Sequence, residues 1–136
     1  MKKKSNGHAR PILIVEHDTE GRDALRVVFE AWGYDVVTAA SELRALRMRS
    51  VHDPDVVVIG LHGREGCELI RRLKAKAVGG LSVVAYSGAA AVERAARAAG
   101  ADEFILKPDT PKLERVLLRG DRAAAPRVRR RRAPRA

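Results

Sequence analysis

Residues able to do chemistry directly follow several apolar runs of this sequence. An acid, an imidazole and a second acid come after residues 12–15, as Glu16, His17 and Asp18, and His62 follows a later run. Imidazole together with carboxylate suits Zn²⁺ or Ni²⁺. However, no metal-ligand spacing motif supports such a site, and Asp18 is well placed to cap a helix that begins after it. Two interpretations stay open: a metal site from these four residues, or capping and solvated side chains.

The chain contains a single cysteine, Cys67, which follows Gly66 at the start of an expected helix. A helix N-terminus can lower the pKa of a thiol, although a buried and unreactive cysteine is the commoner case. Because one cysteine cannot form an internal disulfide, we expect a reducing compartment and a cytoplasmic location. The apolar runs are far shorter than the roughly 20 residues of a membrane span.

Five short apolar runs alternate with amphipathic stretches between Pro11 and Gly120. The runs are mostly continuous, as expected for strands buried on both faces of a parallel sheet. We expect strands at residues 12–15, 35–38, 56–59, 83–86 and 103–106. Right-handed crossover connections would place helices on both faces of that sheet. The pattern therefore predicts one doubly wound α/β domain.

The stretches between the runs have helical spacing. In one of them Leu25, Val28, Phe29 and Trp32 recur at i, i+3, i+4 and i+7. In another, Leu69, Ile70, Leu73 and Ala77 fall on one face of a helix. We expect Ser41 and Thr110 to cap helix starts, and Gly120 to follow the end of the last helix. Residues 89–99 are mostly alanine, so this helix buries little area and should be the most mobile.

The positive charge lies at the ends of the chain. Of the 27 basic and 17 acidic residues, residues 1–10 hold four basic ones, and residues 120–136 hold seven arginines and one acid. The stretch 11–119 therefore holds 16 of each sign and is neutral. This distribution argues against a basic face across the domain of the kind that nucleic-acid readers carry.

Five fragments resemble, in order, the receiver domains of response regulators, the CheY-like family of two-component signalling. They are residues 11–18, 31–36, 54–61, 83–88 and 99–108, the last ending in the family's Lys-Pro pair. The resemblance spans about residues 10–118. It implies a (βα)5 flavodoxin-like fold with sheet order 2-1-3-4-5 and a functional crevice outside the carboxyl ends of the strands.

The family's phosphorylation site is matched only in part. Members carry two acids after strand one that hold Mg²⁺, and a phosphoacceptor aspartate that ends strand three. The resemblance places Glu16 and His17 at the acidic positions and Gly60 at the phosphoacceptor position. The remaining family positions agree: the hydroxyl Ser87, the lysine Lys107 and the switch aromatic Phe104. Because glycine has no side chain, the resemblance implies that phosphoryl chemistry is lost and that Mg²⁺ binds weakly or not at all.

The ammonium group of Lys107 would point into this crevice, where the expected aspartate is missing. A desolvated charge needs a partner, so we expect an ion pair with Glu16 or Asp18; the alternative is a lysine that reaches water. Ser87 has two interpretations as well, a local hydrogen bond or helix cap and a switch role.

We therefore predict a stand-alone signalling module, neither an enzyme nor the carrier of a cofactor. It would bind a protein partner through its fourth helix, fifth strand and fifth helix. The predicted boundaries are a basic extension at 1–9, the receiver-like domain at 10–119 and a disordered arginine-rich tail at 120–136.

Two alternatives stay open. The first is a DNA-associated regulator whose tail binds nucleic acid or another acidic partner through counterion release, using Arg129, Arg130, Arg131 and Arg132. The second is a receiver phosphorylated at Glu16 or Asp18.

Overall fold

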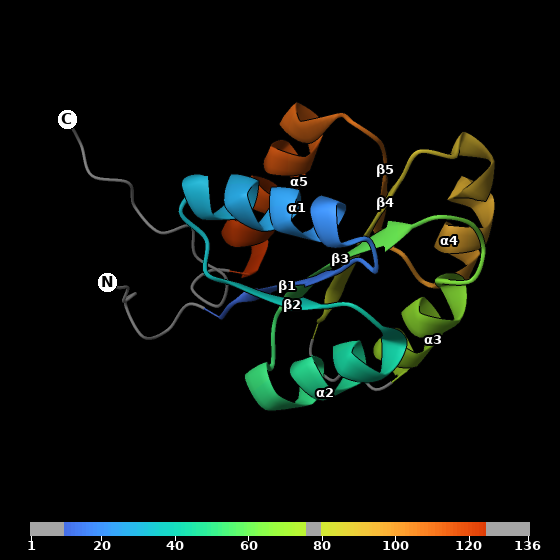
Figure 1. Ribbon diagram of the computed structural model, residues 1–136, viewed down its shortest axis with the longest axis horizontal. Helices are drawn as coiled ribbons and strands as arrows, with labels where there is room; N and C mark the ends of the chain where they lie inside the picture. Colours follow the sequence, from blue (N-terminus) through green and yellow to red (C-terminus); the bar gives the residue numbers. More distant parts are fainter. Residues whose placement is uncertain (1–9, 76–79, 125–136) are drawn as a thin grey trace.

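The computed structural model describes residues 10–75 and 80–124, and a parallel sheet of five strands forms its centre (Figure 1). The strands are β1 (Ile12–Val15), β2 (Val36–Ala39), β3 (Val56–Leu61), β4 (Ser82–Ser87) and β5 (Glu103–Leu106). Their order is β2-β1-β3-β4-β5, and each neighbouring pair is parallel. The predicted fold and sheet order are confirmed.

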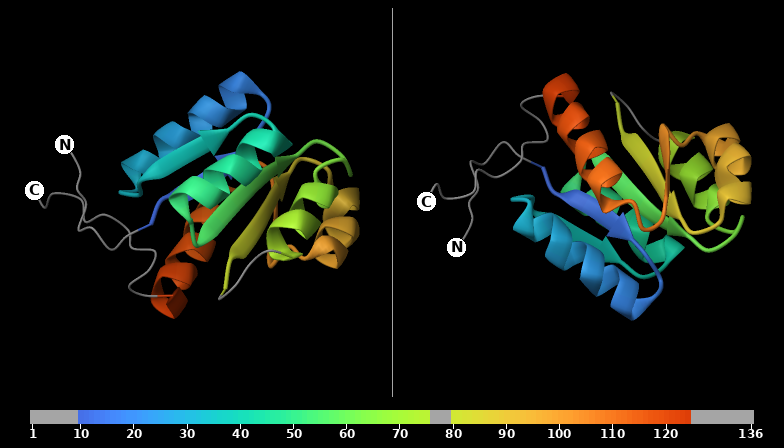
Figure 2. Two further views of the ribbon diagram at one scale, coloured as in Figure 1. Left: turned by 90° about the horizontal axis from the view of Figure 1, so that it is seen from below. Right: turned by 90° about the horizontal axis from the view of Figure 1, so that it is seen from above.

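In the part of the chain that the structure describes, five α-helices cover the two faces of the sheet (Figure 2). They are α1 (Thr19–Ala31), α2 (Glu42–His52), α3 (Cys67–Ala75), α4 (Glu93–Ala99) and α5 (Thr110–Ala124), with a short 3₁₀ turn, η1 (Ala90–Val92), before α4. Helices α1 and α5 lie on one face, and α2, α3 and α4 lie on the other. The segment expected as one helix at 89–99 is thus a 3₁₀ turn followed by a helix of seven residues.

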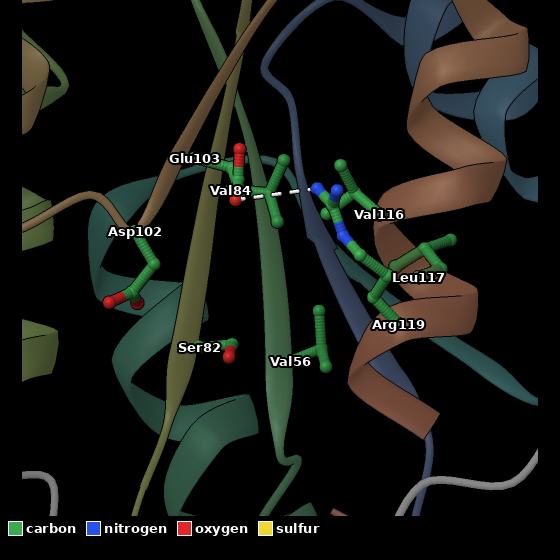
Figure 3. Close-up of a pocket in the computed structure, with 8 residues that line it drawn as sticks. All are labelled: Val56, Ser82, Val84, Asp102, Glu103, Val116, Leu117 and Arg119. Carbon is green, nitrogen blue, oxygen red and sulfur yellow. Dashed lines mark hydrogen bonds and ion pairs between the residues drawn. The ribbon is translucent and has the colours of Figure 1, made fainter. Parts of the chain in front are cut away.

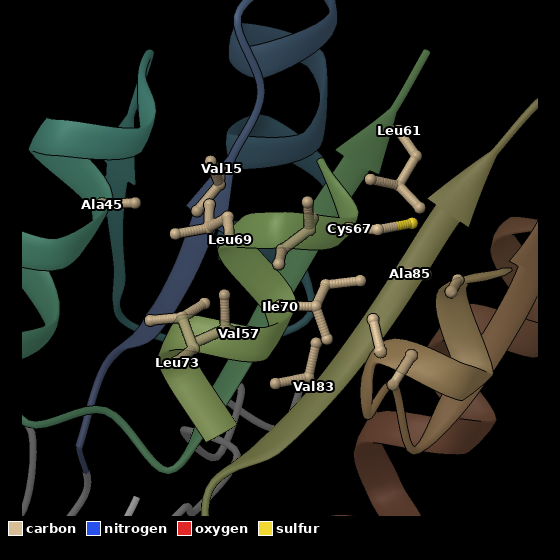
Figure 4. Close-up of a cluster of buried hydrophobic side chains, with 14 of the residues drawn as sticks. Val15, Ala45, Val57, Leu61, Cys67, Leu69, Ile70, Leu73, Val83 and Ala85 are labelled. Carbon is tan, nitrogen blue, oxygen red and sulfur yellow. The ribbon is translucent and has the colours of Figure 1, made fainter. Parts of the chain in front are cut away.

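Two apolar clusters bury the faces of the sheet, which explains why the strands read as continuous apolar runs. Figure 4 shows the larger cluster, in which Ile70 and Leu73 of α3 pack against Val57 and Val83 of the central strands. The smaller cluster joins α1 and α5 to the other face, with Phe29 fully buried. Both predicted helical stripes therefore supply core residues.

Strands β3 and β4 extend further toward their carboxyl ends than the apolar runs indicated. Their ladder continues through the pairs Gly60–Tyr86 and Leu61–Ser87. Strand β1 ends earlier, at Val15, which pairs with Ile59. The residue that follows β1 therefore lies beside Gly60, at the crevice that the resemblance implied.

The helix ends confirm some of the predicted caps and correct others. The side chain of Ser41 accepts a hydrogen bond from the backbone N–H of Arg44 and caps α2 as expected. The prediction for Thr110 was wrong: the carboxylate of Asp109, one residue earlier, accepts a hydrogen bond of 3.0 Å from the N–H of Lys112. Thr110 is the first residue of α5.

The predicted end of the last helix at Gly120 was also wrong, because α5 continues to Ala124. The residues after Gly120 include Arg122 and three alanines, which favour helix, and no proline occurs before Pro126. Helical structure thus reaches beyond the predicted domain end at 119. The predictions for residues 1–9, and for the rest of the tail with Arg129 to Arg132, fall outside the described residues.

The cap of α5 can be tested by two neighbouring substitutions. Asp109→Ala should lower the free energy of unfolding by about 1 kcal/mol, because it removes the acceptor for one of the free N–H groups of the first turn. Thr110→Ala is the matched control and should change it by less than about 0.5 kcal/mol. Both values are measured by urea denaturation. A larger loss of unfolding free energy in Thr110→Ala than in Asp109→Ala would show that Thr110 caps the helix.

Candidate functional site

The carboxylate of Glu16 is the centre of the site. Glu16 directly follows β1, and its side chain is only 1 % exposed. Its Oε2 accepts a hydrogen bond of 2.9 Å from the backbone N–H of Asp18 and lies 2.6 Å from Nε2 of His62. An acid buried this fully must be paired or hydrogen-bonded, and here both oxygens have polar neighbours.

Gly60 makes room for this carboxylate. A Cβ atom built on Gly60 would overlap Oε1 of Glu16 and lie 2.9 Å from its Cδ. The Glu16 carboxylate therefore fills the space in which a side chain at position 60 would begin. Glycine here reflects a close approach to the strand end, which is one of the common reasons for glycine at such a position.

Lys107 reaches the same carboxylate from the far side of β3. Its backbone N–H donates to the carbonyl of Ser87, and its Nζ lies 3.5 Å from Oε1 of Glu16 and 5.5 Å from the ring centre of Tyr86. The predicted ion pair is confirmed, with Glu16 as the partner. Asp18 instead caps α1: its Oδ2 accepts a hydrogen bond of 2.8 Å from the N–H of Gly21.

The electrostatics favour an ionised Glu16. Burial alone would raise the pKa of this carboxyl group. The hydrogen bonds from the Asp18 N–H and from His62, and the positive charge of Lys107, outweigh burial and hold the pKa of Glu16 below its ordinary value. The site therefore carries a fixed negative charge with a lysine beside it.

Two imidazoles complete the cluster on its solvent side. The rings of His17 and His62 meet edge to face with their centres 4.3 Å apart, and Nδ1 of His17 lies 3.8 Å from Oε2 of Glu16. The two side chains are 67 % and 42 % exposed. They line a cleft with Gly60, Glu65 and other residues between β1, β3 and α3. The structure thus brings together three of the four predicted metal-binding candidates and directs the carboxylate of the fourth, Asp18, to the cap of α1.

The other predicted site residues lie nearby with local roles. Ser87 is fully buried, and its Oγ accepts a hydrogen bond of 3.1 Å from the N–H of Ala89, which agrees with the local-bond interpretation. Phe104 and Cys67 are both buried in the larger apolar cluster. Sequence reasoning missed Tyr86, whose ring lies under Lys107; its position next to Ser87 was the available signal.

A second cavity lies at the opposite ends of the strands, between β3, β4, β5 and α5 (Figure 3). Apolar side chains such as Val84 and Val116 form its walls, and Arg119 and Glu103 approach within 3.5 Å across it. It contains none of the predicted site residues.

Residues 12–117 match the model of the response regulator receiver domain. The chain belongs to this family. Its receiver fold is similar to a solved receiver domain from Methanospirillum hungatei JF-1, at 28% identity and a TM-score of 0.71, over 85% of this chain and 97% of that one. Among residues 10–75 and 80–124, no helix combines the length and apolarity that crossing a membrane requires.

Curated relatives of this receiver domain are longer proteins. The aerobic respiration control protein ArcA of Escherichia coli K12 is 33% identical over 103 residues, which cover 74% of this chain and 43% of ArcA. The transcriptional regulatory protein KdpE of Mycobacterium tuberculosis is 29% identical over 99 residues, which cover 71% of this chain and 44% of KdpE. The chain therefore spans less than half the length of these relatives.

Mg²⁺, the ion that the receiver family implies, does not fit the residues present. Mg²⁺ requires oxygen ligands in a near-octahedral arrangement. The cluster offers one carboxylate, Glu16, while imidazoles stand at positions 17 and 62 and Gly60 offers no side chain. Lys107 also lies 3.5 Å from the second oxygen of Glu16.

Proposed function

We propose that this receiver domain is a degenerate member of its family, which signals without being phosphorylated. The position of Glu16 against Gly60 carries the proposal. The resemblance assigns position 60 to the phosphoacceptor, and the Glu16 carboxylate fills the space that an aspartate side chain would need there. The missing nucleophile is thus replaced by a charge supplied from the residue after β1.

The ion pair of Glu16 and Lys107 supports a site that stays in one state without phosphorylation. In the family, the lysine pairs with the phosphorylated group; here a carboxylate already lies 3.5 Å from its Nζ. Phosphoryl transfer also depends on metal ions that neutralise the moving charge, and the ligands for Mg²⁺ are not in place. We therefore propose a protein that is not an enzyme and that acts in the cytoplasm by binding a signalling partner.

The proposed partner surface consists of α4, β5 and α5. Strand β5 is an edge strand of the sheet, which leaves one side of its backbone for another chain. The side chain of Leu106, at the end of β5, is 45% exposed and lies next to Lys107 in the sequence. A partner at this surface would contact the segment that connects directly to the Glu16 site.

Treatment with a small phosphodonor tests the proposal. We expect the intact mass to stay unchanged after incubation with acetyl phosphate and Mg²⁺, because Gly60 offers no oxygen nucleophile. A receiver domain that keeps the strand-three aspartate serves as the positive control under the same conditions. A stoichiometric gain of one phosphoryl group would overturn the proposal. Repeating the assay with Glu16→Gln and Asp18→Asn would then identify which acid accepts it.

A further inference from the structure

We propose that Glu16, His17 and His62 form a binding site for a borderline divalent cation of the Zn²⁺ class. The site lies at the solvent-facing edge of the cleft between β1, β3 and α3. This proposal does not rest on the lack of phosphorylation.

The donor atoms have the spacing that such an ion requires. Bonds of about 2.0–2.1 Å to nitrogen and oxygen in a tetrahedral arrangement place ligand atoms about 3.3 Å apart. Oε2 of Glu16 lies 2.6 Å from Nε2 of His62 and 3.8 Å from Nδ1 of His17, and all three donor atoms fall within 4.8 Å of one another. A cation between them needs only small rotations of two partly exposed imidazole side chains.

The carboxylate is already oriented for one metal bond. Its Oε1 faces Gly60 and Lys107, while its Oε2 faces the two imidazoles. The N–H of Asp18 holds Oε2 in place at 2.9 Å. Outer contacts of this kind fix the orientation of a metal ligand. Glu16 would thus bind the cation through Oε2, while its Oε1 stays paired with the ammonium group of Lys107.

The chemistry of the donors selects the class of ion. Two imidazoles and one carboxylate form a ligand set typical of zinc sites with an open position, and imidazole also suits Ni²⁺ and Cu²⁺. The exposure of His17 and His62 leaves the remaining positions to water. Mg²⁺ is disfavoured because it requires oxygen ligands. His17 stands where the family carries an acid, so this position offers a nitrogen ligand in place of an oxygen ligand.

The test is a Zn²⁺ titration of the full chain against a chromophoric chelator. We expect binding of one ion with micromolar or tighter affinity and no competition from millimolar Mg²⁺. His17→Asn and His62→Asn should each weaken binding at least about tenfold, since loss of even an outer contact commonly costs 10–100-fold. His52→Asn is the matched control, because His52 is the last residue of α2 and lies outside the cluster. This variant should bind as the unmodified protein does.

A second readout separates this site from binding by scattered histidines. Co²⁺ in place of Zn²⁺ should give visible absorption typical of four or five ligands, and the signal should be lost in His17→Asn and His62→Asn. Circular dichroism of each variant establishes that it folds. Equal affinities in the unmodified protein and in the variant lacking both His17 and His62 would overturn the proposal, as would a loss of binding in the control. Neither result would change the outcome expected in the phosphorylation assay, so the two proposals can fail separately.

Discussion

Gly60→Ala is expected to lower the free energy of unfolding by about 1–3 kcal/mol, the usual cost of overpacking a buried site. The added Cβ would overlap Oε1 of Glu16. The carboxylate is the end of a flexible side chain, so it could move away. Moving it would break the contacts of the Glu16 side chain, which is 1 % exposed, with the Asp18 N–H, His62 and Lys107. Urea denaturation measures the loss as a shift of the midpoint at constant slope.

Two comparisons isolate the contact with Glu16. A Cβ atom added at Gly88, which lies at the same end of the sheet, would meet open space, so Gly88→Ala should change stability by less than about 0.5 kcal/mol. In the Glu16→Ala background, Gly60→Ala should lose most of its cost, because the overlapping carboxylate is gone. If Gly60→Ala were equally destabilising in that background, the added Cβ atom would be meeting a group other than the Glu16 carboxylate. A neutral Gly60→Ala would contradict the close approach itself.

The fold could be predicted because each strand leaves a signal in its own residues. The predicted strands at β1 and β5 matched the observed strands residue for residue. The run at β1 is apolar throughout because it is buried on both faces of the sheet. In β5 only the two central residues, Phe104 and Ile105, are buried. Helix ends were harder to predict. At α5, adjacent Asp109 and Thr110 both suit a cap, and only the backbone geometry chooses between them.

The candidate site was predictable in part. The pairing of Lys107 followed from a general argument, because a desolvated ammonium group needs a carboxylate. The contact of Glu16 with Gly60 could not be predicted from the residues alone, because it depends on where β1 ends relative to β3. From the sequence, Gly60 stands at the family's phosphoacceptor position; the structure adds that the Glu16 carboxylate occupies the space beside it. The contact of His62 with Glu16 similarly depends on the path of the loop after β3.

The ion pair of Glu16 and Lys107 should contribute measurably to stability. We expect Glu16→Gln to lower the free energy of unfolding by about 1.5–3 kcal/mol, the range for hydrogen bonds to charged groups. Lys107→Met should cost about 1–3 kcal/mol, because it removes a cation from a carboxylate that is almost fully buried. An exposed pair would give less than about 1 kcal/mol. The side chain of Lys107 is 30 % exposed, so part of its charge is solvated and the lower end of its range applies.

The double variant then decides whether the two residues act as a pair. If they do, Glu16→Gln with Lys107→Met should cost less than the sum of the two single changes, by more than about 1 kcal/mol. Asp18→Asn combined with Lys107→Met is the control. Asparagine also caps helices, and Asp18 contacts Gly21 instead of Lys107, so these two effects should add within about 0.5 kcal/mol. Additive effects in both cycles would mean that water screens the Glu16–Lys107 contact. In that case the close approach to Gly60, and not the charge of Lys107, would fix the position of the Glu16 carboxylate.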